Sequence, residues 1–229
     1  MANEILSYLE MCQREGLSLQ KGMNFRVGNG HSIILMSQRP NAPYRDRIED
    51  DGSTLIYEGH DEPKRRDLPD PKTADQPRST PRGTLTENGK FEQAASRYKQ
   101  GAAPPERVRV YEKIRAGIWS YNGLFHLVDS WGESDGRRHV FKFKLVAAED
   151  ESASVDQRPY DLESTRLIPS KVKLEVWQRD NGRCVTCGAT DNLHFDHIIP
   201  YSRGGTSLRA ENIQLLCARH NLAKRDRIE

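Results

Sequence analysis

The chain has 229 residues, of which 35% are hydrophobic and 30% are charged, and its mean hydropathy is −0.80. This length allows two small domains or one larger one, and the low hydrophobic content predicts compact cores joined by many loops. The 35 Lys and Arg residues nearly balance the 33 Asp and Glu residues, so the net charge of +2 does not by itself indicate a nucleic-acid-binding protein.

The first residues of the chain, MANEILSYLEMCQREG, lack the basic start, apolar run and cleavage site of an export signal. No apolar stretch approaches the roughly 20 residues that a membrane-spanning helix needs. We therefore expect a cytoplasmic protein that does not bind a membrane. In that reducing compartment the four cysteines favour metal ligation over disulfides, and Cys12, alone near the start, is expected to be a partly buried bystander.

The first part of the chain predicts a mainly β module. Apolar residues at helical spacing predict a helix over about residues 3–15. Short strands are expected in MNFRVG, HSIILMS and TLIYEGHD, then an exposed loop over 60–83 and a helix in TENGKFEQAASRYKQG. The segments ERVRVYEKI, GLFHLVDSWGES and RRHVFKFKLVAA then alternate like strands of a curled antiparallel sheet.

An acidic segment at 147–164 separates this module from a smaller one. After it, SKVKLEVWQRD predicts an amphipathic helix capped by Ser170. A turn with two cysteines, a strand-like NLHFDHIIPYS and a helical tail from about Asn212 follow. The pattern predicts three regions: a domain over 1–148, an acidic linker over 149–168 and a small metal-dependent domain over 169–229.

Two pairs of metal-ligand residues lie in the last region. Cys184 and Cys187 form a Cys-x-x-Cys pair, and Cys217 and His220 form a Cys-x-x-His pair. Zinc prefers four such ligands in a tetrahedron, and two close pairs supply them while joining distant segments. A region of about sixty residues has too few residues for a large core, so a metal site that stabilises it is expected. The spacing predicts a structural zinc site, and the alternative is a set of thiols buried in a core.

A second polar group accompanies these ligands. On a helical tail Asn221 lies about 100° around the axis from His220, so it cannot easily reach the same ion. Its oxygen suits Mg²⁺ or Mn²⁺ better than zinc. Asp196 and His197 supply a carboxylate to hold a divalent cation and an imidazole to take a proton from water, as phosphodiester cleavage requires. Taken alone, this Asp-His pair also fits a surface pair with a hydrogen-bonded histidine.

The segments RDNGRCVTCG, LHFDHIIPYSRGGTS and ENIQLLCARHNLAK resemble the HNH endonucleases, whose fold is a ββα-metal finger. The resemblance implies that His197 is the general base, that Asp196 and Asn221 hold the catalytic metal, and that Asn212 braces the active-site loop. Many relatives end in Cys-x-x-Cys-His, whereas this chain has His220 as the fourth zinc ligand and Asn221 at the catalytic position. Both replacements keep the chemistry that the site needs.

Basic residues around this motif are expected to contact DNA phosphates, with ordinary solvation as the alternative for each. They are Arg203, Arg219, Lys224 and Arg225. His194 falls on the same strand face as Asp196, and we expect it to face solvent or DNA.

The first module resembles the SRA (or YDG) domains, curled β-barrels that read modified cytosine by flipping it out of the duplex. The segments SIILMSQRPNAPYRDRIEDDGSTLIYEGHD, LTENGKFEQAA and VRVYEKI to WSYNGLFHLVDSW carry this resemblance over about residues 20–148. The family's Tyr-Asp-Gly signature appears here as Tyr121-Asn122-Gly123.

A flipped base needs aromatic faces to stack on and a polar group for its Watson–Crick edge. Tyr44 and Tyr57 match the family's pair of stacking aromatics, and Asp46 is expected to accept a hydrogen bond from the cytosine amino group. The loop is one residue longer than the family pattern, so Asp50 or Asp51 stays open for this role. Ordinary packing is the alternative for each tyrosine, and the 60–83 loop either inserts into a DNA groove or remains exposed.

Together these resemblances imply an α+β protein with an N-terminal curled β-barrel, flanking helices and a small zinc-stapled ββα-metal finger. The implied function is a modification-dependent restriction endonuclease that reads 5-methylcytosine or 5-hydroxymethylcytosine in double-stranded DNA. It would use structural Zn²⁺ and catalytic Mg²⁺ or Mn²⁺, and cleavage of both strands implies a homodimer or two independent nicks. The alternatives are a non-catalytic reader of modified DNA with a structural finger, and an HNH nuclease that reads unmodified sequence.

Overall fold

The computed structural model describes residues 3–27, 30–39, 41–49, 52–148, 167–200 and 203–224. The strands are β1 (Glu4–Ser7), β2 (Met23–Val27), β3 (His31–Met36), β4 (Arg47–Glu49), β5 (Thr54–Glu58), β6 (Glu106–Arg115), β7 (Ile118–Ser134), β8 (His139–Ala147), β9 (Leu193–His197) and β10 (Ile213–Cys217). The helices are α1 (Tyr8–Glu15), α2 (Glu87–Lys99), α4 (Ser170–Arg179) and α5 (Ala218–Lys224), with short 3-10 helices η2 (Pro71–Thr73) and η4 (Ala210–Asn212). None of the helices in these ranges is long and apolar enough to cross a membrane.

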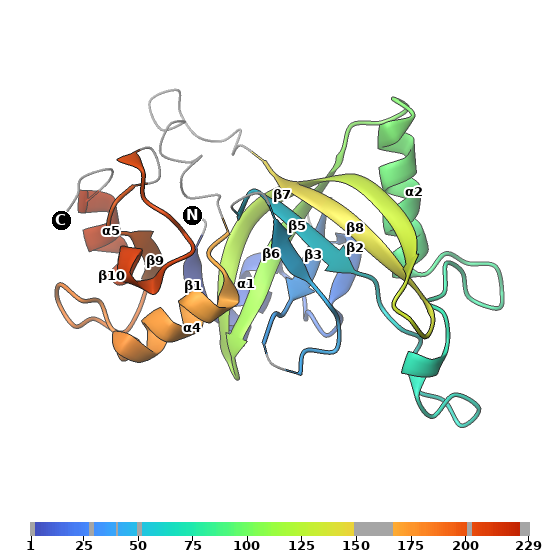
Figure 1. Ribbon diagram of the computed structural model, residues 1–229, viewed down its shortest axis with the longest axis horizontal. Helices are drawn as coiled ribbons and strands as arrows, with labels where there is room; N and C mark the ends of the chain where they lie inside the picture. Colours follow the sequence, from blue (N-terminus) through green and yellow to red (C-terminus); the bar gives the residue numbers. More distant parts are fainter. Residues whose placement is uncertain are drawn as a thin grey trace.

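A single hydrogen-bonded sheet runs through both parts of the molecule (Figure 1). Its order is β10-β9-β1-β7-β6-β3-β2, and β8, β5 and β4 continue from β7 along a second branch. Strand β7 has 17 residues, so its first part pairs with β1 and β6 while its later part pairs with β8. Among the described residues β2 and β4, at the two ends of the curled N-terminal part, do not pair with each other. The α+β prediction is confirmed, but the sheet is open.

The N-terminal core lies between the curled sheet and α2. Phe91 and Ala95 on α2 are fully buried against apolar side chains of the strands, among them Val108, Phe125 and Phe143. Helix α2 begins after Thr86, whose side chain accepts a hydrogen bond from the backbone of Gly89. The strands predicted in this region form because alternate side chains enter this core, as the burial pattern of β6 illustrates.

The amino terminus differs from the predicted helix over residues 3–15. Residues Glu4–Ser7 form β1, and the helix begins only at Tyr8. A capping box sets this boundary: Ser7 accepts from the backbone of Glu10, and the Glu10 side chain accepts from the backbone of Ser7. Because a strand can satisfy its backbone groups from both sides, all four residues pair with β7 on one edge, and Glu4 also pairs with His194 of β9 on the other.

Two predictions for the C-terminal region were also wrong in detail. Ser170 does not cap α4: it is the first helical residue, and its hydroxyl bonds to Glu112 on β6 instead. The tail is not helical from Asn212, because residues Ile213–Cys217 form β10 and α5 begins at Ala218. All five residues of β10 are buried, and a short apolar run of this kind does not distinguish a strand from a buried helix by its period.

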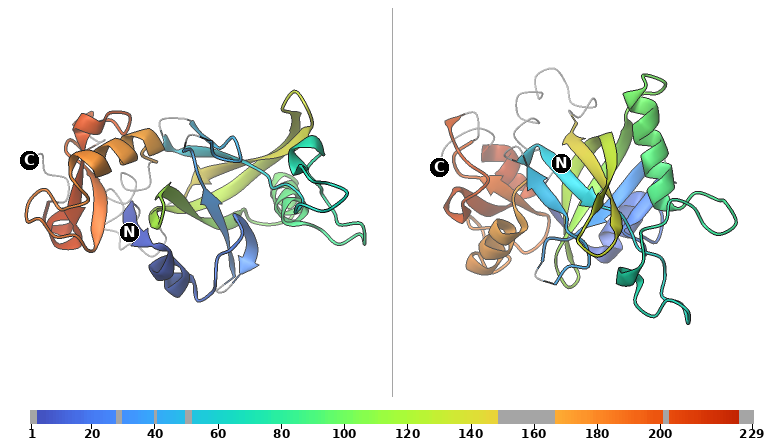
Figure 2. Two further views of the ribbon diagram at one scale, coloured as in Figure 1. Left: turned by 90° about the horizontal axis from the view of Figure 1, so that it is seen from below. Right: turned by 45° about the vertical axis from the view of Figure 1, so that its right-hand side comes forward.

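The junction between the two parts is packed. Most of the predicted linker, residues 149–166, lies outside the described residues, but its last two residues are fully buried. Leu167 joins the N-terminal core and donates its backbone N–H to Gly52, whereas Ile168 joins the core beneath β9 and β10. Ile5 on β1 packs against the same C-terminal core. Figure 2 shows α4 and the C-terminal strands against the edge of the curled sheet.

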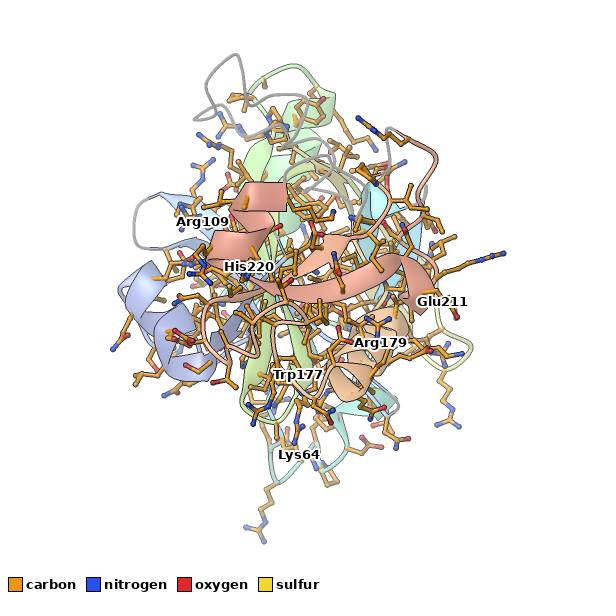
Figure 3. All side chains as sticks on the ribbon, turned by 90° about the vertical axis from the view of Figure 1, so that its left-hand side faces the viewer. Lys64, Arg109, Trp177, Arg179, Glu211 and His220 are labelled. Carbon is orange, nitrogen blue, oxygen red and sulfur yellow. The ribbon has the colours of Figure 1, made fainter. Side chains whose placement is uncertain are left out.

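Helix α4 is held to the C-terminal hairpin by two adjacent polar residues. Arg179 donates to the backbone carbonyls of Ala210 and Ile213, at 2.8 and 2.7 Å. The Asp180 carboxylate accepts from the backbone of Leu215 at 2.9 Å and is bonded to Arg179. In Figure 3 the labelled His220 and Arg179 mark α5 and α4 on either side of the C-terminal strands. This helix–strand–helix arrangement positions the first candidate site.

Candidate functional site

The predicted zinc ligands meet at one point. Cys184 and Cys187 lie in the turn after α4, Cys217 ends β10, and His220 lies in α5. Their ligand atoms all lie within 4.8 Å of one another. The Sγ atoms of Cys187 and Cys217 are 3.8 Å apart, and His220 Nδ1 lies 3.5 Å from Cys184 Sγ and 3.2 Å from Cys217 Sγ. A tetrahedron with Zn–S bonds of about 2.3 Å has S–S edges of about 3.8 Å, so this group can hold a metal ion such as zinc.

The thiol chemistry of the cluster suits a metal. Burial by itself would raise the pKa of the Cys184 thiol, but hydrogen bonds from the backbone of Cys217, Cys187 and Thr186 outweigh it and lower that pKa to about 6. The thiolate, which is the form that binds metals, is therefore favoured at this position. Cys12 lies apart from the cluster and packs with an N-terminal apolar group, as expected for a bystander.

Asp196 and His197 end strand β9, at the opposite end of the hairpin from Cys217, which pairs with Leu193. Asp196 Oδ2 accepts from Gln214 Nε2 at 3.3 Å across the hairpin. The His197 side chain is buried, and its Nε2 lies 2.9 Å from the hydroxyl of fully buried Ser207. This bond sets the orientation of the imidazole, so Ser207 is a positioning residue that the sequence motif did not reveal.

Asn212 braces the segment that follows His197. Its Oδ1 accepts from the backbone of Ile199 at 2.8 Å, and its Nδ2 donates to the carbonyls of Ile199 and Thr206, both at 3.0 Å. Gly205 allows this close approach, because a Cβ atom there would lie 1.8 Å from the Ile199 carbonyl oxygen. The geometry corresponds to the loop-bracing role that the resemblance implied for Asn212.

Lys224 occupies a place different from the predicted phosphate contact. The residue is 2% exposed, and its ammonium lies 2.9 Å from Asp196 Oδ2 and donates to the His197 carbonyl at 2.5 Å. The reason is helix geometry: α5 packs against β9, so the side of its last turn that faces the hairpin is buried. Asn221, one turn earlier at i−3, lies on the same side of the helix as Lys224.

This ammonium shows that the position beside Asp196 accepts a cation. The available donors are the Asp196 carboxylate and, on the side of α5 that carries Lys224, the Asn221 amide oxygen. Both are hard oxygen ligands of the kind that Mg²⁺ and Mn²⁺ prefer. The chemistry of these two donors suits Mg²⁺ or Mn²⁺, and the Lys224 ammonium lies at the Asp196 carboxylate that such an ion would need.

The other basic residues and His194 have different surroundings. Arg203 and Arg219 are exposed, and Arg225 lies outside the described residues. His194 does not face solvent or DNA: it is 3% exposed, next to Glu4 of β1, and its burial lowers its pKa to about 4. The prediction failed because pairing with β1 covers a strand edge that the local sequence leaves open.

The second candidate site lies at the end of the curled sheet. Asp46 accepts backbone hydrogen bonds from Glu58 at 3.1 Å and from Ser37 at 3.3 Å. Burial raises the pKa of its carboxyl to about 7 despite these bonds. Asp50 and Asp51, the alternatives for the same role, lie outside the described residues.

The two predicted stacking tyrosines differ in exposure. Tyr57 is 1% exposed within the N-terminal core, and its hydroxyl lies 2.8 Å from His60 Nε2 and within 3.4 Å of two backbone carbonyls. Tyr44, in the loop after β3, is half-buried and stacks on the ring of His60, with ring centres 4.6 Å apart and planes 8° apart. His60 therefore lies next to both tyrosines.

The 60–83 loop is attached to the sheet by buried charges. Arg138 on the turn before β8 pairs with Asp61 at 2.7 Å and donates to the carbonyls of Pro71 and Ala74. Its side chain is 1% exposed. Lys72 on the same loop donates to the Pro43 carbonyl at 2.5 Å and lies over the Tyr44 ring, so the loop and Tyr44 are held together.

A buried polar group also joins the two modules. Lys173 of α4 donates to Glu112 Oε2 and to Asn122 Oδ1, both at 2.7 Å, and Asn122 donates to the same Glu112 oxygen at 3.1 Å. The Lys173 and Glu112 side chains are both 0% exposed. Asn122, the residue that departs from the Tyr-Asp-Gly signature, therefore lies at the contact with the C-terminal part. Because the Asn122 amide is neutral, the buried group contains one negative charge, on Glu112, and one positive charge, on Lys173.

Four residues of these sites do not stand out in the sequence: His60, Ser207, Glu112 and Lys173. His60 had a usable signal, since it is an aromatic ring within the predicted strand TLIYEGHD, three residues after Tyr57. The other three act through contacts with distant segments, and no local spacing marks them.

Comparison with known proteins agrees with the C-terminal geometry. Residues 184–227 match the HNH endonuclease family. Similar solved structures include the SUVH5 SRA domain with methylated CHH DNA (21% identity, TM-score 0.44, 65% of this chain and 89% of that chain). Others are the SUVH5 SRA domain with hemi-methylated CG DNA (22%, 0.43, 67% and 91%) and KRYPTONITE with mCHG DNA and SAH (17%, 0.39, 68% and 34%). No curated protein matches the chain. Residues 184–227 are thus similar to the HNH endonuclease family, and the likeness to the SRA structures, at 22% identity or less, concerns the fold alone.

Proposed function

We propose that this protein is a modification-dependent DNA endonuclease. Its N-terminal part would bind a modified cytosine that has been flipped out of duplex DNA, and its C-terminal part would hydrolyse the nearby backbone. The observation that carries the proposal is that Asp196 and His197 lie together at the end of β9, with the His197 ring bonded to Ser207 and the following segment held by Asn212.

His197 is the general base in this proposal. The Ser207 hydroxyl orients the ring through Nε2, and Asn212 fixes the backbone that follows, so the imidazole is held in one position. A neutral imidazole can take a proton from water near neutral pH and so produce the hydroxide that attacks phosphorus. A positioned base of this kind typically accelerates a reaction by about 10²–10⁴-fold.

Asp196 and Asn221 hold a divalent ion in the same proposal. Bound Mg²⁺ or Mn²⁺ would neutralise negative charge on the scissile phosphate. The Cys184, Cys187, Cys217 and His220 group has a separate role, because it holds the turn after α4 against β10 and α5 and so maintains the hairpin that carries Asp196 and His197.

In this proposal the loop after β3 and strand β5 bind the flipped base. Tyr44 supplies a stacking face, Tyr57 lines the same region, and the Asp46 carboxylate accepts from the cytosine amino group. Two backbone N–H groups hold this carboxylate in place, which keeps its orientation defined before DNA binds. The substrate is then double-stranded DNA with 5-methylcytosine or 5-hydroxymethylcytosine.

One experiment tests this function directly. Matched plasmids with and without cytosine methylation are incubated with the zinc-loaded protein and Mg²⁺ or Mn²⁺, and nicked and linear products are separated on a gel. We expect cleavage of the methylated plasmid only, and at least a 10²-fold loss for His197→Ala. The matched control is His139→Ala, which changes an exposed histidine at the start of β8.

The outcomes separate the alternatives. Equal cleavage of both plasmids would replace this proposal with an HNH nuclease that reads unmodified sequence. Selective binding without cleavage would leave a reader with a structural finger. The ratio of nicked to linear product over time shows whether two chains act together or each strand is cut independently.

A further inference from the structure

The rings of Tyr44 and His60 form a closed stack at the proposed base pocket. Their centres are 4.6 Å apart and their planes differ by 8°, so the two faces are in contact and leave no room for a base between them. Tyr57 lies at the edge of this pair: its ring centre is 6.0 Å from that of His60 and its plane is tilted by 35°. The two residues with parallel faces are therefore Tyr44 and His60.

His60 is held rigidly from several sides. Asn88 of α2 clamps its backbone, accepting from the His60 N–H and donating to the His60 carbonyl, both at 2.8 Å. The Tyr57 hydroxyl lies 2.8 Å from Nε2, and a Cβ atom on Gly22 would lie 2.4 Å from the imidazole. The glycine at position 22 thus leaves space for the ring. Since Asn88 is itself 2% exposed, the imidazole is fixed against the core.

Tyr57, in contrast, is an unfavourable stacking surface. It is 1% exposed within the N-terminal core, and its hydroxyl contacts His60 and the Gly22 and Leu35 carbonyls. Tyr44 lies on the loop between β3 and β4, half-buried and between exposed neighbours, and it is held by the Asp61 backbone N–H at its hydroxyl and by Lys72 over its ring, outside the apolar core that holds Tyr57.

We propose that His60, rather than Tyr57, is the second stacking face of the base pocket, and that the flipped base enters between Tyr44 and His60. In this arrangement Tyr44 moves away by about the thickness of one ring, roughly 3.4 Å, while His60 stays fixed on its Asn88 clamp. The base then replaces the stack that closes the empty pocket. The role of Tyr57 is to orient the imidazole through its hydroxyl.

The charge state of His60 is consistent with a stacking role. Burial lowers its pKa to about 4, so the ring is neutral at physiological pH, although Asp61, Glu87 and Glu58 act in the opposite direction and Lys72 acts in the same one. Lys72 binds Asp61 at 2.8 Å and lies 4.1 Å from the centre of the Tyr44 ring, so it keeps Tyr44 in the closed position until DNA binds.

The inference depends on the proposed reading of modified cytosine, so the test measures both separately. The protein carries His197→Ala to prevent cutting. Duplexes contain one 5-methylcytosine or one cytosine, with 2-aminopurine beside it to report unstacking by fluorescence, and affinity is measured by anisotropy. If the His197→Ala protein binds the methylated and unmethylated duplexes equally, the proposed function is wrong, and this result does not depend on the role of His60.

Given that preference, His60→Ala should weaken binding of the methylated duplex by about ten-fold or more and abolish the 2-aminopurine signal, as expected for loss of one stacking face. His60→Phe, which keeps a flat ring, should retain most of both. Binding of the unmodified duplex should be equal in all three proteins, which also shows that the variants are folded. His60→Ala with unchanged affinity and fluorescence would overturn the inference, as would a folded His60→Phe that behaves like His60→Ala.

Discussion

The N-terminal sheet and the C-terminal hairpin are stabilised in different ways. The N-terminal core buries apolar side chains from six strands of the curled sheet and from α2, including Phe91, Phe125 and Phe143. The C-terminal part has smaller groups, and one of them consists of Leu193 and Leu216 with two of the metal-ligand cysteines. Small modules bury too little apolar surface to offset the entropy of folding, so we expect a metal held by the Cys/His group to supply much of the stability of this part.

The two candidate sites differ in how ready they are to bind a ligand. The Cys/His cluster has ligand atoms already at metal-binding distances, whereas the base pocket is closed by the stack of Tyr44 on His60. The first site needs only an ion to be complete, and the second must open before it can bind a base. We expect a metal ion to stabilise the C-terminal part and apolar packing to stabilise the N-terminal part, and changes at single residues can test this difference.

The largest effect is expected from loss of the zinc site. Cys217→Ser, or removal of the ion with a strong chelator, should unfold the C-terminal part, because structural zinc contributes on the order of 10 kcal/mol in small fingers. Zinc content, thermal unfolding and the fluorescence of Trp177, which packs on the C-terminal core, measure this. Cys12→Ser is the matched control, since Cys12 lies outside the cluster. A Cys217→Ser protein that keeps zinc and has an unchanged Tm would show that the C-terminal part does not depend on the metal site for its stability.

The next effect concerns the buried pair that joins the parts. Lys173→Met should lower the free energy of unfolding by about 3–5 kcal/mol, because it leaves the Glu112 carboxylate buried without its ammonium. Adding Glu112→Gln should restore part of the loss. Urea denaturation provides the measurement, and Lys171→Met, which changes an exposed lysine on the same helix, is the control. Equal stability of Lys173→Met and the wild type would mean that the modules do not depend on this contact.

A smaller effect is expected within the proposed nuclease site. Lys224→Met leaves Asp196 without the ammonium at 2.9 Å, which should cost about 1–3 kcal/mol in the absence of a catalytic divalent ion. Mn²⁺ should then raise the Tm of the variant more than that of the wild type, because no ammonium competes for the carboxylate. Differential scanning fluorimetry of the zinc-loaded proteins tests this, with Arg219→Met on the exposed side of α5 as control. An identical Mn²⁺ response in both would contradict a shared cation position.

The smallest effect concerns Asp46 and pH. Its folded pKa of about 7 exceeds the ordinary value of 3.8, so the folded protein binds more protons between these values and Asp46 opposes folding more strongly as pH rises through this window. Asp46→Asn should therefore match the wild type near pH 4 and gain in relative Tm up to about pH 8. Nearby Glu58 strengthens the effect and Lys142 weakens it. A difference in Tm that stays constant from pH 5 to pH 8 would show that burial does not hold this carboxyl protonated.

Local spacing was sufficient for the metal ligands and for most strands. Cys184, Cys187, Cys217 and His220 lie in two short pairs, and ligand geometry limits how such pairs can meet. The Ser7–Glu10 capping box is a sequence signal for the start of α1. The helix was nevertheless predicted to begin earlier, because apolar residues at helical spacing lie on both sides of Ser7. Strand β10 was not distinguishable, since a short apolar run fits either structure.

Contacts between distant segments explain what local spacing left out. Glu112 and Lys173 are 61 residues apart, and nothing near either one marks it as half of a buried pair. In the sequence Lys224 is one of several basic residues near the C-terminus, which predicts a position on the surface. Its contact with Asp196 results from the packing of α5 on β9. The stack of Tyr44 on His60 likewise depends on the Asn88 clamp from α2, which is 28 residues away from His60.

The sequence by itself determined the two Cys/His ligand pairs and most of the segments that form strands, and it indicated Asp196, His197 and Asn212 as a group, because each depends on side-chain type and short-range period. The tertiary structure alone decided that β1 joins both parts of one open sheet, that Lys224 lies beside Asp196 and that His60 faces Tyr44. These features result from burial and from pairing between segments far apart in the chain, where the free energy depends on the folded neighbours of a residue and not on its neighbours in sequence.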